Sequence, residues 1–271
     1  ALLDSSEHYS IAKHELADHG VVVKGVDLDL ATMMKRKEKV VSSLTTGVAG
    51  LMKKNKIDVL KGSGVIQANK SVEVTDESGA KTVYTAAKGI IIATGARSRE
   101  LPNLPQDGTK IIGYRQAMTL PTQPKKLVVV GSGAIGVEFA YFYNAIGTEV
   151  TVVEYLPNIV PVEDEEVSKQ LEKSFKKAGI NIMTNASVEA VDTSGKGCVV
   201  TIKTEKGEEK IECDVVLSAV GIQANIENIG LETVGIVTDK GRILVNEYYQ
   251  TNIPGYYAIG DVVPGPALAH V

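Results

Sequence analysis

The sequence contains few cysteines and no tryptophan. Cys198 and Cys213 are the only cysteines in 271 residues, which excludes the disulfide framework typical of small secreted proteins. A chain so poor in cysteine fits a reducing compartment, and we expect a cytoplasmic protein. The four histidines lack the spacing of a metal site, so we predict no bound metal.

Basic charge and long apolar runs are also scarce. The 29 lysines and arginines are outnumbered by 33 aspartates and glutamates, whereas nucleic-acid-binding proteins usually present a basic face. No apolar run approaches the ~20 residues that a membrane-spanning helix requires. We therefore expect neither a nucleic acid nor a membrane as a partner. Hydrophobic residues make up 44% of the chain, enough to bury the core of one large domain or two smaller ones.

A long helix is predicted over residues 31–54. Leu44, Val48 and Leu51 lie on one stripe of this helix, and lysines lie elsewhere. The pattern is typical of an amphipathic helix with a solvated basic face. Binding to a membrane surface or to a partner is the alternative, which the acidic balance of the protein disfavours.

Strands and helices alternate from residue 125 onward. The segment KKLVVVGSGAIGVEFAYFYNAIGTEVTVVE, residues 125–154, predicts a strand, a helix and a second strand. The segment EDEEVSKQLEKSFKKAG predicts another helix and INIMT a third strand. A hairpin is predicted between Cys198 and Cys213, and an apolar strand follows over 214–221. This alternation predicts an α/β fold with a parallel sheet, of the Rossmann-like dinucleotide-binding type.

The first half of the chain repeats the closing part of this pattern. A predicted hairpin over residues 71–86 leads into an apolar strand that ends in Ala-Thr-Gly, as the second hairpin leads into one that ends in Ala-Val-Gly. Gly131 precedes Gly221 by 90 residues, and the same count back from Gly95 reaches Ser5. We therefore expect the opening strand, turn and helix of another dinucleotide domain to precede this chain.

Gly131, Gly133 and Gly136 form a G-x-G-x-x-G fingerprint between a predicted strand and a predicted helix. The first glycine permits the tight turn, the second lets the pyrophosphate of a dinucleotide approach the backbone, and the third lets helix and strand pack closely. Glu154 ends the next strand, where a carboxylate can accept hydrogen bonds from ribose hydroxyls and would repel a 2′-phosphate. No arginine follows in YLPN, so we predict NAD(H) rather than NADP(H).

Two further acids have open roles at this stage. Glu138, in the first turn after the fingerprint, either interacts with the positive end of the helix or approaches the reactive end of the cofactor. Asp261 follows a short apolar strand and either caps the next element or holds a ligand hydroxyl at the carboxyl end of a sheet.

The segment TNIPGYYAIGDVVPGPALAH, residues 251–270, resembles the second flavin-binding signature, T-x-x-P-x-x-Y-A-x-G-D, of the two-dinucleotide flavoprotein disulfide reductases. IIIATGA resembles the shorter flavin-binding segment of this family, and GSGAIGVEFA with TVVE resembles its NAD unit. ALLDSSEHYSIA and GPALAH are most similar to the dihydrolipoamide dehydrogenase branch. The resemblance covers essentially the whole chain and implies Rossmann-like domains with a three-layer ββα arrangement, plus β-hairpins.

The resemblance implies NAD and FAD as cofactors and suggests residues for each. The NAD site would comprise Gly131, Ser132, Gly133, Ala134, Ile135, Gly136, Val137, Glu138, Glu154, Val188 and Gly221. The FAD site would comprise Gly64, Thr94, Gly95, Ala96, Asp261, Ala267, Leu268, Ala269 and His270. Glu138 would lie near the nicotinamide and pair, as in the family, with a lysine that precedes the chain.

The same resemblance implies a domain organisation and a reaction. Residues 1–119 would belong to a partial FAD-binding domain, 120–245 to the NAD-binding domain, and 246–271 to a return segment of the FAD-binding domain. The complete protein, a homodimer, would pass electrons from dihydrolipoamide, or from the lipoyl domain of a 2-oxoacid dehydrogenase complex, through a redox disulfide and FAD to NAD⁺.

The sequence also departs from the family pattern. It lacks the first fingerprint, the redox C-x-x-x-x-C and the C-terminal histidine and glutamate of the family, so we assign no catalytic residue and expect the chain alone to be inactive. Ile222, Gln223 and Ala224 follow Gly221 where the family usually has arginine and proline. An NADH oxidase, a mercuric reductase or a non-catalytic NAD-binding module are the alternative interpretations.

Overall fold

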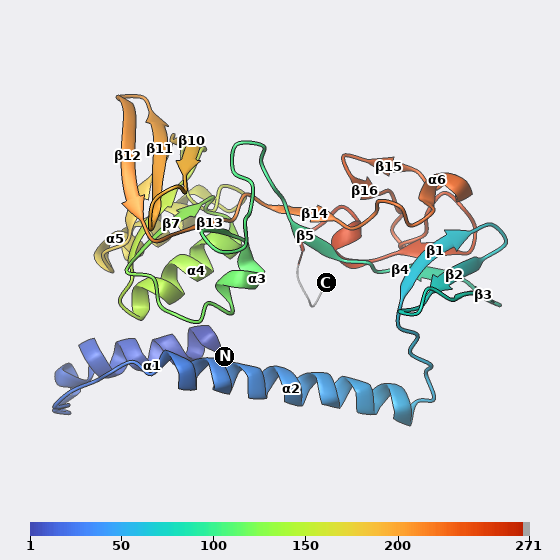
Figure 1. The fold of residues 1–271 in the computed structure, drawn as a ribbon, viewed down its shortest axis with the longest axis horizontal. Helices are drawn as coiled ribbons and strands as arrows, with labels where there is room; N and C mark the ends of the chain where they lie inside the picture. The colour runs from blue at the N-terminus through green and yellow to red at the C-terminus, as the bar shows by residue number, and fades with distance from the viewer. Residues whose placement is uncertain (268–271) are drawn as a thin grey trace. The chain divides into compact units, whose positions relative to one another are not determined.

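The computed structural model describes residues 1–267 and contains two compact units, each built from two separate segments of the sequence (Figure 1). The first unit comprises Ala1–Gly47 and Ser98–Gly221, and the second Val48–Arg97 and Ile222–Val271. In the described part of the chain, no helix combines the length and apolar character needed to cross a membrane. Our assignment of 1–119, 120–245 and 246–271 to cofactor-binding domains stays a prediction.

A five-stranded parallel sheet lies at the centre of the first unit. Its strands, in spatial order, are β6 (Ile111–Ile112), β13 (Val215–Ser218), β7 (Lys126–Val130), β8 (Glu149–Val153) and β9 (Asn181–Met183). Val128 of β7 is in register with Thr151 of β8 on one side and with Val216 of β13 on the other. The strand order therefore reverses beside β7, and such a switch point opens a ligand crevice at the carboxyl ends of the strands.

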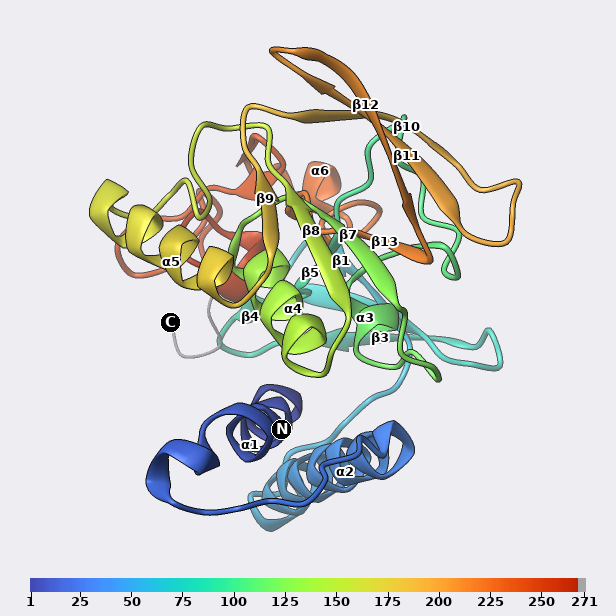
Figure 2. The same ribbon diagram turned by 90° about the vertical axis from the view of Figure 1, so that its left-hand side faces the viewer.

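Helices cover one face of this sheet and an antiparallel sheet covers the other (Figure 2). The covering elements are α4 (Ala134–Ala145) and α5 (Glu165–Lys177) on one side, and β10 (Ser187–Asp192), β11 (Cys198–Thr204) and β12 (Gly207–Cys213) on the other. Side chains alternate along β7: Leu127 and Val129 are buried against the helices, and Val128 and Val130 against the antiparallel sheet. The expected three-layer ββα arrangement is confirmed.

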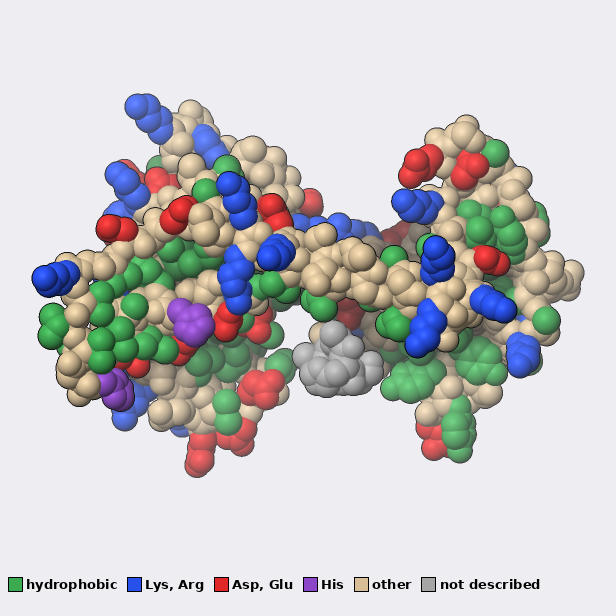
Figure 3. Space-filling view, turned by 90° about the horizontal axis from the view of Figure 1, so that it is seen from below, with side chains coloured by type: hydrophobic (Ala, Val, Ile, Leu, Met, Phe, Trp, Pro, Cys, Tyr) green, Lys and Arg blue, Asp and Glu red, His purple; other side chains and the backbone are tan. Residues whose placement is uncertain are grey.

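The N-terminal residues are helical. The helices are α1 (Leu2–His14), the 3₁₀ turn η1 (Leu16–His19) and α2 (Leu30–Lys54), and the short α3 (Tyr114–Ala117) follows β6. The predicted helix over 31–54 is confirmed, but α2 buries none of its residues, and Leu44, Val48 and Leu51 are all exposed. Lysines and arginines gather toward the ends of α2, and hydrophobic side chains reach the surface between them (Figure 3).

The second unit contains short sheets around its own core. The predicted hairpin over 71–86 is confirmed, and it belongs to an antiparallel sheet of β1 (Ser63–Gln67), β2 (Ser71–Thr75) and β3 (Lys81–Thr85). The remaining elements are β4 (Ile90–Ile92), β14 (Ile222–Ala224), α6 (Leu231–Val234), β15 (Thr238–Asp239), β16 (Arg242–Ile243), β17 (Tyr256–Ala258) and η2 (Gly260–Val262), with β5 (Ala96–Ser98) at the unit boundary. Ile92 of β4 and Ala258 of β17, which pair in parallel, are buried in this core.

Candidate functional site

The turn from β7 into α4 requires two of its three glycines for steric reasons. Gly131 has a φ of +94°, and a Cβ atom there would lie 2.5 Å from the carbonyl oxygen of Ala219 in the neighbouring chain segment. A Cβ atom on Gly136 would collide with the carbonyl oxygen of Gly131. The first and third glycines thus permit the tight turn and the close packing that the fingerprint predicts.

Gly133 and Gly221 instead border open space. Gly133 precedes the first residue of α4, and a methyl group there would meet no protein atom within 4 Å. The same holds for Gly221, whose φ of +108° is rarely adopted by other residues and which follows β13. The first N–H groups of α4 have no partner within the helix and favour an anion. The carboxyl ends of β7 and β13 therefore leave room for a pyrophosphate beside a helix N-terminus.

Glu154 is clamped by the fingerprint loop. The residue is only 7% exposed at the end of β8, and Oε2 of its carboxylate accepts hydrogen bonds from the backbone N–H (2.8 Å) and the hydroxyl (2.6 Å) of Ser132. Oε1 accepts a hydrogen bond of 2.8 Å from the backbone N–H of Leu156. A carboxylate has about four acceptor positions, so Oε1 retains capacity for a ribose hydroxyl. The clamp was missed from the sequence, where its only signal is a hydroxyl residue between the first two glycines.

Glu138 lies beside the beginning of α1. A groove of about 470 Å³ runs between three helices and is lined by Leu3, Asp4 and Glu7 of α1, Val137, Glu138 and Tyr141 of α4, and Leu171 and Phe175 of α5. The Tyr141 hydroxyl donates to the Glu7 carboxylate, and burial together with this carboxylate raises the pKa of Tyr141 to about 12. The structure thus places Glu138 on an apolar groove next to the first residues of the chain.

Val188 of β10 has little exposed surface. Its side chain is buried with Val130 and Val200 between the two sheets, and its carbonyl oxygen accepts a hydrogen bond of 2.7 Å from the Asn103 side chain. Of the other NAD-site residues proposed from the sequence, Ala134 is exposed in the first turn of α4, whereas Ile135 and Val137 are partly buried against the core.

A second candidate site lies in the second unit, where the parallel strands β4 and β17 end at one edge. Gly95 and Gly260 follow these strands with φ values of +68° and +72°, and no protein atom lies within 4 Å of the position of a Cβ atom on either. The backbone carbonyl of Asp261 accepts a hydrogen bond of 2.8 Å from Arg242. Asp261 lies inside the 3₁₀ turn η2, whose N-cap residue is Ile259, so its carboxylate does not cap that element.

The remaining residues proposed for FAD are scattered over the second unit. Gly64 lies in β1, where a Cβ atom would be 3.3 Å from Val72 of β2, and Ala96 begins β5. Ala267 is exposed. Leu268, Ala269 and His270 lie outside the described residues.

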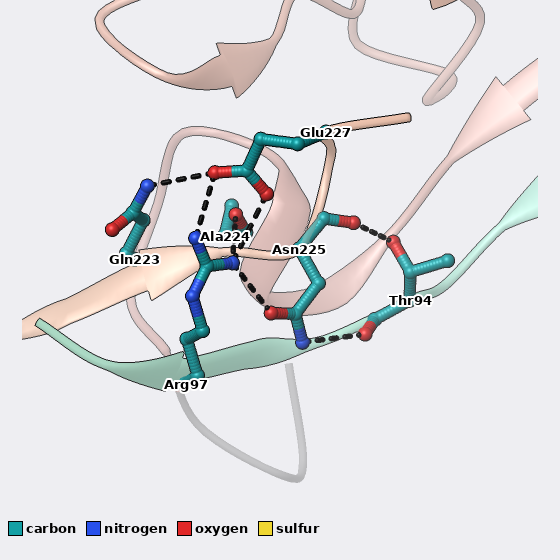
Figure 4. Close-up of polar contacts among 6 residues, drawn as sticks. All are labelled: Thr94, Arg97, Gln223, Ala224, Asn225 and Glu227. Atoms are coloured by element: carbon teal, nitrogen blue, oxygen red, sulfur yellow. Dashed lines mark hydrogen bonds and ion pairs between the residues drawn. The ribbon is translucent and has the colours of Figure 1, made fainter. Parts of the chain in front are cut away.

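A polar network fixes the Ala-Thr-Gly segment that follows β4 (Figure 4). Thr94 donates a hydrogen bond of 2.6 Å to the carbonyl of Asn225, whose side chain donates to the carbonyl of Thr94. Arg97 binds both carboxylate oxygens of Glu227 at 3.0 and 2.8 Å and also donates to the Asn225 side chain. Gln223 donates a further bond of 2.7 Å to Glu227. The glycine turn is therefore held by residues of β14 and of the segment that follows it.

Replacement of Glu227 by glutamine is expected to reduce the acid sensitivity of the second unit. The Arg97 hydrogen bond lowers the pKa of the Glu227 carboxyl from 4.5 to about 2. A carboxyl whose pKa is lowered on folding stabilises the fold above pH 4.5, and this contribution is lost as the pH falls toward 2. Urea unfolding at several pH values would show a flatter profile for Glu227→Gln over that interval. Glu232→Gln, at an exposed position of the same unit, is the control, and identical profiles for all three proteins would contradict this role.

Cys198 and Cys213 lie directly opposite each other at the ends of β11 and β12, and both are buried. Burial raises the pKa of Cys198 and raises that of Cys213 to about 12. A thiol is reactive as its thiolate, so both cysteines are expected to be inert in the folded protein. No group of three or more metal-binding side chains accompanies them within residues 1–267.

This inertness predicts slow modification. At pH 8 both thiols should react with a dithiobenzoate disulfide reagent about 100-fold more slowly in the folded chain than in urea. A Cys198→Ser variant would assign the residual rate to one thiol. Equal rates in folded and unfolded protein would show that the hairpin leaves the thiols accessible.

Comparisons with known proteins identify the family of the chain. The sequence profile of the family described as pyridine nucleotide-disulphide oxidoreductase matches residues 1–271. The chain is 46% identical over its whole length to 54% of the mitochondrial dihydrolipoyl dehydrogenase of Pisum sativum, and 45% identical to 52% of the leghemoglobin reductase of Vigna unguiculata. The solved structure of LpdA from Mycobacterium tuberculosis matches the whole chain with a TM-score of 0.88 and 28% identity, over 58% of that protein. The chain therefore spans about half the length of the curated relatives it matches.

Proposed function

Because the chain belongs to the pyridine nucleotide-disulphide oxidoreductase family, we propose that it forms part of an NAD-linked flavoprotein with dihydrolipoyl dehydrogenase activity. The family binds FAD and NAD. The observation that carries the proposal is the open space at Gly133 and Gly221, which lies at the carboxyl ends of β7 and β13 beside the N-terminus of α4. The clamped carboxylate of Glu154 stands at the end of the adjacent strand.

These residues fit the parts of NAD. The N–H groups of the first turn of α4 would bind the pyrophosphate, which can approach because Gly133 has no side chain. Glu154 would accept a hydrogen bond from the adenosine ribose through Oε1, since Ser132 occupies Oε2. Glu138, on the groove beside α1, would lie toward the nicotinamide end.

The second unit fits one side of a FAD site. Asp261 would accept a hydrogen bond from a flavin hydroxyl, and the open turns at Gly95 and Gly260 would let the cofactor approach the backbone. When bound, the flavin would supply the relay of an electron pair from a substrate dithiol to NAD⁺. We expect this chain by itself to retain FAD weakly and not to oxidise dihydrolipoamide.

The partners follow from the same proposal. Relatives named dihydrolipoyl dehydrogenase support a role beside a 2-oxoacid dehydrogenase complex. A lipoyl group of that complex as the thiol substrate and a homodimer as the complete protein are our proposals. A cytoplasmic location is our proposal from the low cysteine content, and cell fractionation would test it. A flavin absorption band in the purified protein would argue against a module that binds only NAD.

Glu154→Gln tests the NAD site. The variant keeps the size of the side chain and loses its charge, so NADH should bind about tenfold more weakly, because one hydrogen bond to a charged group contributes about 1.5–3 kcal/mol. NADPH should bind more tightly than to the unmodified chain, because the repulsion of its 2′-phosphate is removed. Calorimetric titration with both nucleotides would measure this.

Glu149→Gln is the matched control. Glu149 is an exposed carboxylate at the opposite end of the same strand and pairs only with Lys126 in the described structure. Its replacement should leave both affinities unchanged. Tighter binding of NADPH than of NADH by the unmodified chain would refute the proposed cofactor.

A further inference from the structure

Tyr155, the residue after Glu154, is an exposed aromatic side chain on a fixed loop. It is 75% exposed, although the Glu154 side chain beside it is buried. The loop backbone is held on both sides: Leu156 donates its N–H to the Glu154 carboxylate at 2.8 Å, Asn185 donates to the Leu156 carbonyl at 3.2 Å, and Ala186 donates to the Glu154 carbonyl at 3.0 Å. Tyr155 is therefore presented to solvent by an ordered backbone.

Exposed apolar residues are common, and exposure alone indicates no function. The position of Tyr155 is what distinguishes it. In the NAD site proposed above, Glu154 holds the ribose that carries the adenine, and a single glycosidic bond joins the two. A base attached to that ribose lies next to the residue that adjoins Glu154. Leu156, 42% exposed, extends the apolar surface there.

We propose that Tyr155 is the adenine platform of the NAD site, with its ring stacked on the base while Glu154 holds the attached ribose. The proposal rests on the proposed NAD function and adds a residue to it. Stacking of a base on an aromatic side chain increases affinity by about 5- to 150-fold. Because stacking uses the face of the ring, the tyrosine hydroxyl is dispensable for it.

Measuring the affinity for three ligands distinguishes stacking on adenine from a general effect of the substitution on the NAD site. Tyr155→Ala should weaken binding of NADH and of ADP-ribose about tenfold, and it should leave binding of reduced nicotinamide mononucleotide, which has no adenine, unchanged. Tyr155→Phe should retain the affinity of the unmodified chain. Tyr248→Ala, which removes a tyrosine that is 70% exposed in the second unit, is the matched control and should change none of the three.

Tyrosine fluorescence gives a second readout, because the chain has 10 tyrosines and no tryptophan. Saturation with ADP-ribose should quench part of the emission, and this part should be missing in Tyr155→Phe although the ligand still binds. Undiminished binding of ADP-ribose by Tyr155→Ala would overturn the inference and leave the NAD site standing. Failure of the unmodified chain to bind ADP-ribose or NADH would refute the proposed function and the platform with it.

Discussion

Replacement of Gly136 by alanine is expected to destabilise the first unit by about 3 kcal/mol or more, near the upper end of the range for overpacked sites. A Cβ atom at this position collides with the carbonyl oxygen of Gly131. The colliding atom belongs to the backbone, so no flexible side chain can move aside, and β7 and α4 must separate. Urea unfolding followed by circular dichroism would measure the loss.

The control for this substitution lies in α2. Gly50 has no protein atom within 4 Å of its Cβ position, so Gly50→Ala should stabilise the helix slightly, as expected for an exposed helical glycine. A Gly136→Ala protein as stable as the unmodified chain would show that the fingerprint turn is looser than described.

Gly133→Ala is expected to have the opposite pattern: a stable protein that binds NADH about 100-fold more weakly, which corresponds to two lost charge-assisted hydrogen bonds of about 1.5 kcal/mol each. Gly133 has a φ of −66°, which alanine adopts without strain, and the added methyl group meets no protein atom. The methyl group would instead occupy the space through which a pyrophosphate approaches the first N–H groups of α4.

The two glycine variants therefore serve as controls for each other, one for stability and one for NADH affinity. Gly133→Ala should unfold at the same urea concentration as the unmodified chain, whereas Gly136→Ala should not. Calorimetry with NADH and ADP-ribose would measure the affinities. If Gly133→Ala binds NADH with unchanged affinity, the pyrophosphate does not lie at this turn, and the proposed NAD site is wrong.

Local sequence patterns predicted most of the elements of the first unit. The strand of Val128 to Val130, the helix after the fingerprint and the hairpin between Cys198 and Cys213 all follow from the period of their apolar residues, which depends only on near neighbours in the chain. The three layers could be predicted for the same reason, because alternating strands and helices leave few arrangements.

Features that depend on distant segments could not be predicted from these patterns. The hydrogen bonds from Ser132 to Glu154 depend on how β7 and β8 pair, and the burial of Val188 depends on the sheet that covers β7. The position of α1 beside Glu138 is likewise a matter of helix packing. The helix α2 was predicted from its amphipathic pattern, but such a pattern does not show whether another element or a partner covers the apolar stripe of Leu44, Val48 and Leu51.

The clamp between Ser132 and Glu154 makes coenzyme preference an epistatic trait. An arginine at position 154 would complement a 2′-phosphate, yet it would face a buried hydroxyl and two N–H groups that now donate to the carboxylate. Unpaired buried donors are costly, so the exchange of one residue would be penalised until the loop around Ser132 also changed. A change from NAD to NADP use in this protein therefore requires substitutions at two or more positions. Either substitution alone is expected to destabilise the fold, because it leaves buried hydrogen-bonding groups without partners.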